Sequence, residues 1–384
     1  MQLGNIYRII VIVAALIWIL TVLYRDMSFF KKNWVFVINS VLFVFLLILH
    51  RRLFGLSLSK SAMQTFQTII IVFTGIISIY YHENDFDFFK VLFPLLLISV
   101  IFFSITTITA IIDNPYAARI ANREWLNERY EGNELVGLYG FVYMCVFLAP
   151  MLLYMQIKKV RLNAFTTFLT VVTLVITLFL VVVSGYMIAI FCCLGSCIVV
   201  LAFHNRSILR TIILLLSFLL FVLFYQNIID ALFSAIMDFT KDNPVYYNKF
   251  SDLRDLFLGS ENIGETVEGR FSNYAASIQD MINYPLIGSY FFGETSGGGH
   301  SAILDMFGKF GFICGILMIY LFVIFPHKIG VRDKKYNVLD YSILIFTLVY
   351  AVLDPIPQEF GINIFIFMPF IISLQHRQSK EANK

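Results

Sequence analysis

The sequence predicts an all-α, polytopic membrane protein with about eleven transmembrane helices and one large extracytoplasmic loop. Of its 384 residues, 59% are hydrophobic and only 14% are charged, which is far more apolar than a water-soluble core requires. Apolar runs of roughly 20 residues, the length of one helical crossing, recur along the chain. They are continuous and rich in Leu, Ile, Phe and Val, whereas barrel strands alternate, so each crossing is expected to be a helix.

Eleven runs fit this description. The expected spans are 6–23, 34–49, 63–81, 91–112, 135–156, 164–183, 186–203, 211–229, 301–325, 339–353 and 360–374. The interval between Arg161 and His204 contains no Asp, Glu, Lys or Arg and is long enough for two crossings, which indicates a hairpin turning at Ser184-Gly185. No repeat and no long linker divides the chain, so residues 1–384 are expected to form a single transmembrane domain.

The distribution of Lys and Arg predicts the orientation, because positive residues in short loops are retained on the cytoplasmic side. Basic residues follow the last span and fill three earlier loops on the same side, which places the C-terminus in the cytoplasm. The loop 229–300 falls on the other side and carries ten acidic against four basic residues. The same count puts 113–134 and the basic stretch His50-Arg51-Arg52 outside, against the rule. One span more or fewer in the N-terminal third would reverse that part.

Within the large loop, residues 271–283 have the period of an amphipathic helix. Apolar side chains recur at intervals of three and four, and polar side chains fill the other face. The apolar set is Phe271, Tyr274, Ala275, Ile278, Met281 and Ile282. Tyr284-Pro285 is expected to end this helix, because the residue before proline disfavours helical backbone. The helix is expected to lie along the membrane surface or to dock on the bundle of spans.

Arg270 stands at the expected start of this helix, which is the wrong end for a cation if only the helix dipole matters. Two interpretations stay open. In the first, Arg270 forms an ion pair with Glu265 or Glu268. In the second, the arginine and the free amides of the helix terminus bind a phosphate together.

His300 follows the three glycines Gly297 to Gly299 and precedes the next span. A histidine at a membrane interface is commonly just an amphipathic side chain. Glycines, however, let backbone approach a ligand closely and can form an anion-binding nest. Since imidazole accepts a proton near neutral pH, His300 is a candidate general base. Glu294 is a competing base, although a solvated loop carboxylate is the simpler interpretation of it.

The cysteines carry no sign of a metal or redox site. All five fall inside apolar runs, without acidic or histidine companions at metal-binding spacing. They are Cys145, Cys192, Cys193, Cys197 and Cys314. We expect buried small hydrophobes, no disulfide, no metal and no cofactor.

Between about Ser184 and Phe325, the order and spacing of these features resemble the bacterial O-antigen polymerase and O-antigen ligase superfamily. That family shows a Gly-Arg pair, an amphipathic helix, a Pro-x-x-Gly turn, a Gly-rich stretch with a histidine, and a span containing a Gly-rich turn of helix. The matching residues are Gly269-Arg270, Phe271 to Asn283, Pro285 to Gly288, Gly297 to His300, and Gly308 with Gly311 and Gly315.

One departure from the family pattern concerns the hairpin. Many relatives carry an arginine beside the serine at its outer end, where this chain has Gly185-Tyr186. The phosphate contact that this arginine makes in the family is therefore either missing here or supplied from elsewhere, with Arg119 and Arg123 as the candidates.

The resemblance implies a polymerase of polyprenyl-diphosphate-linked oligosaccharide repeat units, as in O-antigen, capsular or exopolysaccharide synthesis. The reaction is a glycosyl transfer without nucleotide or metal at the outer face of the bacterial cytoplasmic (inner) membrane. Arg270 would stabilise the leaving diphosphate and His300 would take the proton from the attacking hydroxyl, with Arg119, Arg123 and Glu294 as substrate contacts. Membrane lipid, a flippase and a chain-length regulator are the implied partners, and nucleic acid is not.

Three other interpretations stay open. A ligase would transfer the chain to a different acceptor, such as a lipid A core, and polymerase is preferred because nothing beyond the loop indicates a site for a second large lipid. A secondary transporter or flippase would combine paired broken helices, repeat symmetry and ionisable residues within spans, none of which is clear in this sequence. A structural scaffold would leave the placement of Arg270 and His300 unexplained.

Overall fold

The all-α prediction is confirmed over the part of the chain that the computed structural model describes, where every regular element is a helix and no strand occurs. The described residues are 2–113, 137, 139–160, 162–203, 230–231, 233–241, 246–248, 250–251, 254, 265–295, 298–326, 338–356 and 359–382. The elements with defined bounds are α1 (Gln2–Arg25), α2 (Met27–Lys32), α3 (Trp34–Leu53), α4 (Leu58–Asn84), α5 (Asp87–Asp113), α8 (Tyr139–Ile157), α9 (Ala164–Val183), α10 (Met187–Phe203), α13 (Glu265–Asn283), η1 (Ser289–Phe292), α14 (Ala302–Ile319), η2 (Tyr320–Ile324), α15 (Val338–Leu353), α16 (Phe360–Ile362), η4 (Asn363–Phe367) and α17 (Met368–Ala382).

Seven helices in the described residues are long and apolar enough to cross a membrane. They are Trp34–Leu53, Gln64–Asn84, Asp87–Asp113, Tyr139–Ile157, Ala164–Val183, Ala302–Ile324 and Phe360–Gln378. Three shorter apolar helices, Val13–Arg25, Ile188–Phe203 and Tyr341–Leu353, coincide with further expected spans. The expected span 211–229 lies outside the described residues. A multi-pass membrane protein is therefore supported, whereas the number of eleven spans stays a prediction.

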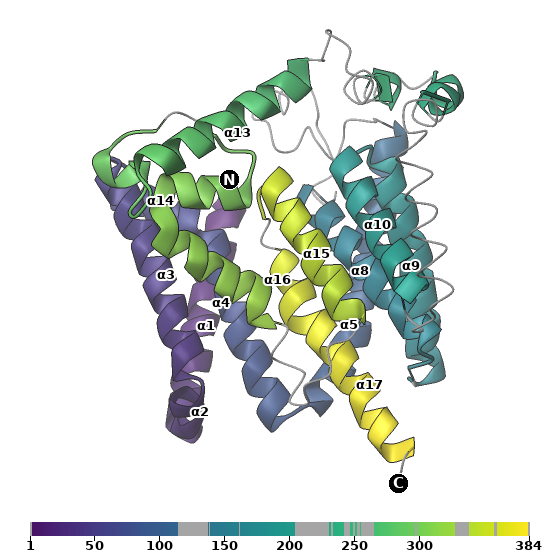
Figure 1. Ribbon diagram of the computed structural model, residues 1–384. Helices are drawn as coiled ribbons and strands as arrows, with labels where there is room; N and C mark the ends of the chain where they lie inside the picture. The colour runs from purple at the N-terminus through teal and green to yellow at the C-terminus, as the bar shows by residue number, and fades with distance from the viewer. Residues whose placement is uncertain are drawn as a thin grey trace.

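The long helices form a bundle with one helix laid across an end of it (Figure 1). α13 slants over that end, which we call the α13 end, and the C-terminus lies at the opposite end. α8 packs against α9 and α10, α5 packs against α9, and α13 packs against α14. As a result, the residues that follow α15 and those that precede α14 lie beneath α13.

The hairpin predicted at Ser184-Gly185 is confirmed. α9 ends at Val183, Gly185 adopts a φ of 63°, and α10 begins two residues later. Glycine suits this turn because it adopts positive φ without steric cost. Three buried threonines of α9, Thr170, Thr173 and Thr177, donate their hydroxyls to carbonyl oxygens one turn earlier. At the start of the helix, the amide of buried Thr166 donates to the side chain of Asn163, which caps α9.

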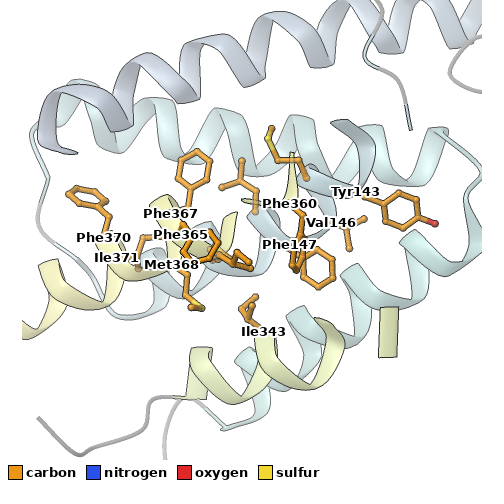
Figure 2. Packing of buried hydrophobic residues seen from close by; sticks show 14 of the residues in the cluster. Tyr143, Val146, Phe147, Ile343, Phe360, Phe365, Phe367, Met368, Phe370 and Ile371 are labelled. Carbon is orange, nitrogen blue, oxygen red and sulfur yellow. The ribbon is translucent and has the colours of Figure 1, made fainter. Parts of the chain in front are cut away.

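The core is dominated by aromatic side chains around α8 and the helices after Phe360 (Figure 2). Phe147 of α8 meets Phe360 edge to face, with ring centroids 5.0 Å apart, and Phe93 lies 5.0 Å from Phe370. Edge-to-face pairs contribute about 0.5–1.5 kcal/mol beyond the area that they bury. Since 78% of α8 is buried inside the protein, it forms the centre of the bundle and rigidly positions the residues at its start.

The cysteines are buried, as their apolar surroundings predict. All five lie in the core as free thiols, two of them one helical turn apart on α10. They pack as small hydrophobic side chains.

Candidate functional site

α13 begins earlier than its apolar period predicts. The helix runs from Glu265 to Asn283, so its end is confirmed and its start lies six residues before the expected 271. Free amides belong to the first turn of a helix, and Arg270 lies beyond that turn. The expectation that Arg270 stands at the helix start beside free amides is therefore wrong.

The face of α13 that meets the bundle is polar. Ser277 and Asp280 are buried against α14, whereas the apolar side chains of Phe271, Ile278 and Ile282 are 53%, 39% and 65% exposed. Gly308 makes this possible, because a Cβ at that position would lie 2.5 Å from the carbonyl oxygen of Ser277. The helix docks on the bundle, as one of the two expectations held, but through a polar face beside the apolar stripe, of which Phe271, Ile278 and Ile282 stay exposed.

Arg270 lies on the inward face and pairs with Asp354. The distance from Nη1 of Arg270 to Oδ2 of Asp354 is 3.8 Å, and the Asp354 side chain is only 5% exposed. Tyr274, one turn further along α13, donates its hydroxyl to the carbonyl oxygen of Leu353 over 2.7 Å. These contacts fasten α13 to the end of α15. The side chains of Glu265 and Glu268, the expected partners of Arg270, lie outside the described set.

Asp354 is a shared acceptor. Tyr143 donates to its Oδ2 over 3.1 Å, and Tyr139 also hydrogen-bonds to the carboxylate. Burial raises the pKa of Asp354 above its ordinary value, and the two tyrosine hydrogen bonds with the charges of Arg270 and His300 offset only part of this rise. Figure 2 shows Tyr143 at the edge of the core with its hydroxyl pointing away from the phenylalanines.

The guanidinium of Arg270 is held but not saturated. Burial lowers the pKa of Arg270, and the charge of Asp354 with the contact to Tyr274 outweighs burial, so the pKa is raised and the side chain stays a cation. Its Nη1 is buried and has no hydrogen-bond partner among the described residues, since 3.8 Å is too long for a hydrogen bond. A buried donor of this kind is costly unless an incoming oxygen satisfies it.

His300 precedes a segment that contacts the end of α15, and it contributes to lowering the pKa of Asp354. The next residues are pinned to the end of α15, because the Ala302 amide donates to the Asp354 carbonyl oxygen over 3.2 Å and Ser301 donates to the Ala351 carbonyl oxygen over 3.3 Å. His300 itself is exposed. The side chain of Arg270 and the backbone just after His300 thus contact the same residue, Asp354.

A cluster of tyrosines surrounds this acid. Tyr139, Tyr143 and Tyr350 are packed together, with Tyr143 and Tyr350 ring centroids 4.5 Å apart. Tyr186, which follows the hairpin glycine, packs edge to face on Tyr139 at 5.5 Å. The end of the α9–α10 hairpin therefore borders the same site as Arg270.

The glycine segment before His300 binds the carboxylate of Asp305. Gly298 and Gly299 have φ values of 80° and 124°, and the Gly299 amide donates to Oδ1 of Asp305 over 3.0 Å. A Cβ on Gly298 would lie 2.2 Å from Oγ of Ser277, so only glycine fits between α13 and α14. In this conformation the expected anion-binding nest is occupied by Asp305. Gly297 lies outside the described residues.

Glu294, another expected substrate contact, is not brought to Arg270. Glu294 is exposed and accepts a hydrogen bond from Tyr284, at the far end of α13. Fourteen residues of helix separate that end from Arg270, which corresponds to about 20 Å. Arg119 and Arg123 lie outside the described residues.

α14 is broken, which the sequence did not make clear. Gly311 has φ 79° and ψ 176° and divides the helix, and the Pro-x-x-Gly turn fills the break. The Phe312 amide donates to the Pro285 carbonyl oxygen over 2.9 Å. A Cβ on Gly288 would lie 2.5 Å from the Gly311 nitrogen, and a Cβ on Gly311 would lie 2.3 Å from the Leu286 carbonyl oxygen. The two glycines make this close backbone approach possible.

Sequence reasoning missed Asp354 and its tyrosines. A usable signal was present, because Asp354 directly follows an apolar run and stands four residues after Tyr350, which is one helical turn. An acid at the end of an apolar run, on the same expected side of the membrane as the large loop, indicates a possible ion-pair partner for Arg270. Tyr139 and Tyr143 have the same spacing at the start of α8.

A cavity of about 230 Å³ lies elsewhere, at the opposite end of the bundle. It is lined by Lys90, Phe93, Leu162, Asn163, Thr166, Phe370 and Leu374. Lys90 already pairs with Asp87 at 2.7 Å, and the other lining side chains are apolar or neutral. This cavity offers no acid–base pair, so the candidate site is the one around Asp354.

No protein-family model matches the sequence, and no curated protein sequence matches it. The resemblance to O-antigen polymerases and ligases therefore rests on the motifs quoted above. The geometry around Asp354 carries the functional argument.

Proposed function

We propose that this protein is a glycosyltransferase that polymerises polyprenyl-diphosphate-linked oligosaccharide repeat units at the outer face of the bacterial cytoplasmic membrane. The observation that carries the proposal is that Asp354 pairs with Arg270 through its side chain and accepts the amide of Ala302, two residues after His300, at its carbonyl oxygen. Two of these residues belong to motifs that resemble the family, and they lie far apart in the sequence. The proposed reaction requires a cation that stabilises the leaving group and a base that takes a proton, close together in one site.

In the proposed reaction, a hydroxyl oxygen of one lipid-linked oligosaccharide attacks the anomeric carbon of another. The bond from that carbon to the diphosphate oxygen breaks, and polyprenyl diphosphate leaves with the electron pair. Arg270 stabilises the negative charge that builds on the leaving group, and its unpartnered Nη1 is the donor offered to it. His300 takes the proton of the attacking hydroxyl.

The division of roles follows from exposure. His300 is exposed and accessible to an incoming hydroxyl, whereas Asp354 is buried and already accepts hydrogen bonds from two tyrosines. Asp354 therefore positions Arg270 and favours its positive charge.

The reaction is tested with purified protein and a lipid-linked oligosaccharide of one repeat unit, without an energy source. Products with two and more repeat units, still attached to polyprenyl diphosphate, are expected. Cells lacking the protein are expected to lose long chains and to retain single repeat units. Product found only on a different acceptor identifies a ligase and excludes the polymerase.

A transporter or flippase is the second candidate, and the broken helix α14 favours it, because transporters build substrate sites at such breaks. Here the break is filled by the chain's own Pro285 turn. Asp354 also stands at the end of α15 rather than in the middle of a span. Movement of a labelled lipid-linked oligosaccharide across the bilayer of proteoliposomes, without lengthening, would decide for this candidate.

A further inference from the structure

Arg51 is a second half-buried arginine at the α13 end of the bundle, in the last turn of α3. Its Nη1 donates to the hydroxyl of Thr65 over 2.5 Å, and its guanidinium lies 5.5 Å from the centre of the Phe310 ring. The Thr65 hydroxyl in turn donates to the Ser61 carbonyl oxygen over 2.8 Å. The arginine is therefore fixed by neutral groups that are themselves fixed.

The charge of Arg51 has no acidic partner among the described residues. Lys32 pairs with Glu83 and Arg254 pairs with Asp230, so other basic side chains of the chain do find carboxylates. A guanidinium has five N–H donors, and the contact to Thr65 uses one of them. A partly desolvated cation with free donors gains most from an anion with several oxygens, such as a phosphate.

Arg51 and Arg270 stand at opposite ends of α13. The turn after α13 is bound to α3 through His50, whose Nε2 lies 2.8 Å from the Ile287 carbonyl oxygen. Arg270 lies near the start of α13, about 20 Å away along the helix. Ser277, midway along α13, donates to Asp305, which also accepts the amide of Gly299 beside His300. Asp305 therefore links the middle of α13 to the backbone beside the proposed base.

We propose that Arg51 binds the diphosphate of the acceptor, the second lipid-linked oligosaccharide, while Arg270 binds that of the donor. This proposal rests on the proposed function, which needs two diphosphate-bearing lipids at once. The apolar helix α3 ends at Leu53, and Arg51 stands in its last turn, at the depth where a membrane lipid carries its phosphate.

The test is the number of polyprenyl diphosphate molecules, without sugar, that purified protein retains in native mass spectrometry. Wild-type protein is expected to bind two. Arg51→Gln and Arg270→Gln are each expected to bind one, and the double variant none. The matched control is Arg52→Gln, because Arg52 is the exposed neighbour that donates to the Leu56 carbonyl oxygen, and it is expected to bind two.

Catalysis gives a second readout. Loss of a charge-assisted contact to phosphate is expected to raise the KM for the single repeat unit at least about tenfold in Arg51→Gln. An unchanged melting temperature would verify that Arg51→Gln is folded. If Arg51→Gln does not fold, Arg51→Lys replaces it in the test, and because lysine keeps the charge but not the planar donors, it is expected to bind the second molecule more weakly than wild type.

The outcomes separate the two proposals. If Arg51→Gln still binds two molecules, the acceptor site is elsewhere and this inference is overturned. If Arg270→Gln binds two while Arg51→Gln binds one, the donor assignment fails and the second site stands. If phosphatidylglycerol vesicles remove the Arg51-dependent molecule as efficiently as polyprenyl diphosphate does, Arg51 binds ordinary lipid headgroups and the acceptor role is overturned.

Discussion

Arg270 and Asp354 approach to 3.8 Å across the junction of α13 and α15, close enough for charge attraction and too far for a hydrogen bond. The carboxylate of Asp354 accepts hydrogen bonds from Tyr143 and Tyr139 instead. The arginine is thus oriented by a carboxylate without being neutralised by direct contact. A diphosphate oxygen can bind the free donor while Asp354 keeps the guanidinium in place.

Replacement of Arg270 by lysine is expected to abolish polymer formation nearly as completely as replacement by alanine. Lysine presents a point charge and cannot reproduce the planar fork that binds two phosphate oxygens. Loss of one donor to a developing anion costs about a hundredfold to a thousandfold in rate. The initial rate of chain lengthening measures this. Arg254→Ala, which breaks an exposed pair with Asp230, is the control and should retain the rate.

His300→Ala and His300→Gln are both expected to lower the rate about a hundredfold to ten-thousandfold, with the protein still in the membrane. Glutamine keeps the hydrogen bonding but cannot take the proton. Glu294→Gln is expected to have little effect, because Glu294 lies at the other end of α13. The reverse result, an active His300→Gln with an inactive Glu294→Gln, would transfer the role of base to Glu294.

Asp354→Asn is expected to lose activity and to change how stability depends on pH. Because the pKa of Asp354 is raised by burial, the folded protein holds this proton more tightly than the unfolded chain. Its contribution to the free energy of unfolding is greatest below the ordinary pKa of 3.8 and declines as pH rises through the raised value. The melting temperature of Asp354→Asn relative to wild type should therefore increase as the pH rises above 3.8 and become constant once the pH exceeds the raised pKa. A difference that is already constant from pH 3.8 upward would contradict the raised pKa.

Gly311→Ala is expected to lower the free energy of unfolding by at least about 1–3 kcal/mol, because its backbone conformation is nearly restricted to glycine. The added Cβ would also meet the Leu286 carbonyl oxygen at 2.3 Å. Gly269→Ala is the matched control. It lies inside α13 with open space around it, so alanine should stabilise the protein by about 0.5–1 kcal/mol. Thermal unfolding in detergent compares the two, and equal melting temperatures would argue against the tight turn.

A cysteine introduced at Ser272, on the exposed face of α13, is expected to react with a membrane-impermeant maleimide in intact cells. A cysteine at Lys159, in a loop predicted to be cytoplasmic, should react only after permeabilisation. Both residues are exposed, and the five native cysteines are buried, so the background should be low. Labelling with the opposite sidedness would place α13 in the cytoplasm and exclude the proposed function.

The sequence was sufficient for the fold class, because composition and run length depend only on which side chains lipid accepts. The hairpin at Ser184-Gly185 and the end of α13 were also predictable, since glycine and proline act through local backbone geometry. The start of α13 was not, because its first turn has no apolar period to read.

The site required information that a single sequence does not hold. The apolar-stripe rule chose the wrong face of α13, since Gly308 and the hydrogen bond from Ser277 to Asp305 favour a polar contact with α14. The partner of Arg270 comes from the end of α15, two helices later. Ion pairs between residues so far apart in the sequence depend on how the helices of the bundle pack, and they produce no periodic pattern in the sequence.

The contact between Gly288 and Gly311 couples the turn after α13 to the break in α14. Because each glycine occupies the space that a side chain on the other would need, the turn after α13 and the break in α14 form a single exchangeable unit. In a chimera that takes residues 265–288 from a relative and keeps its own α14, the transplanted turn and the break in α14 would not be matched in backbone geometry. Transplants meant to alter sugar preference should therefore carry the segment from α13 through Phe312 whole.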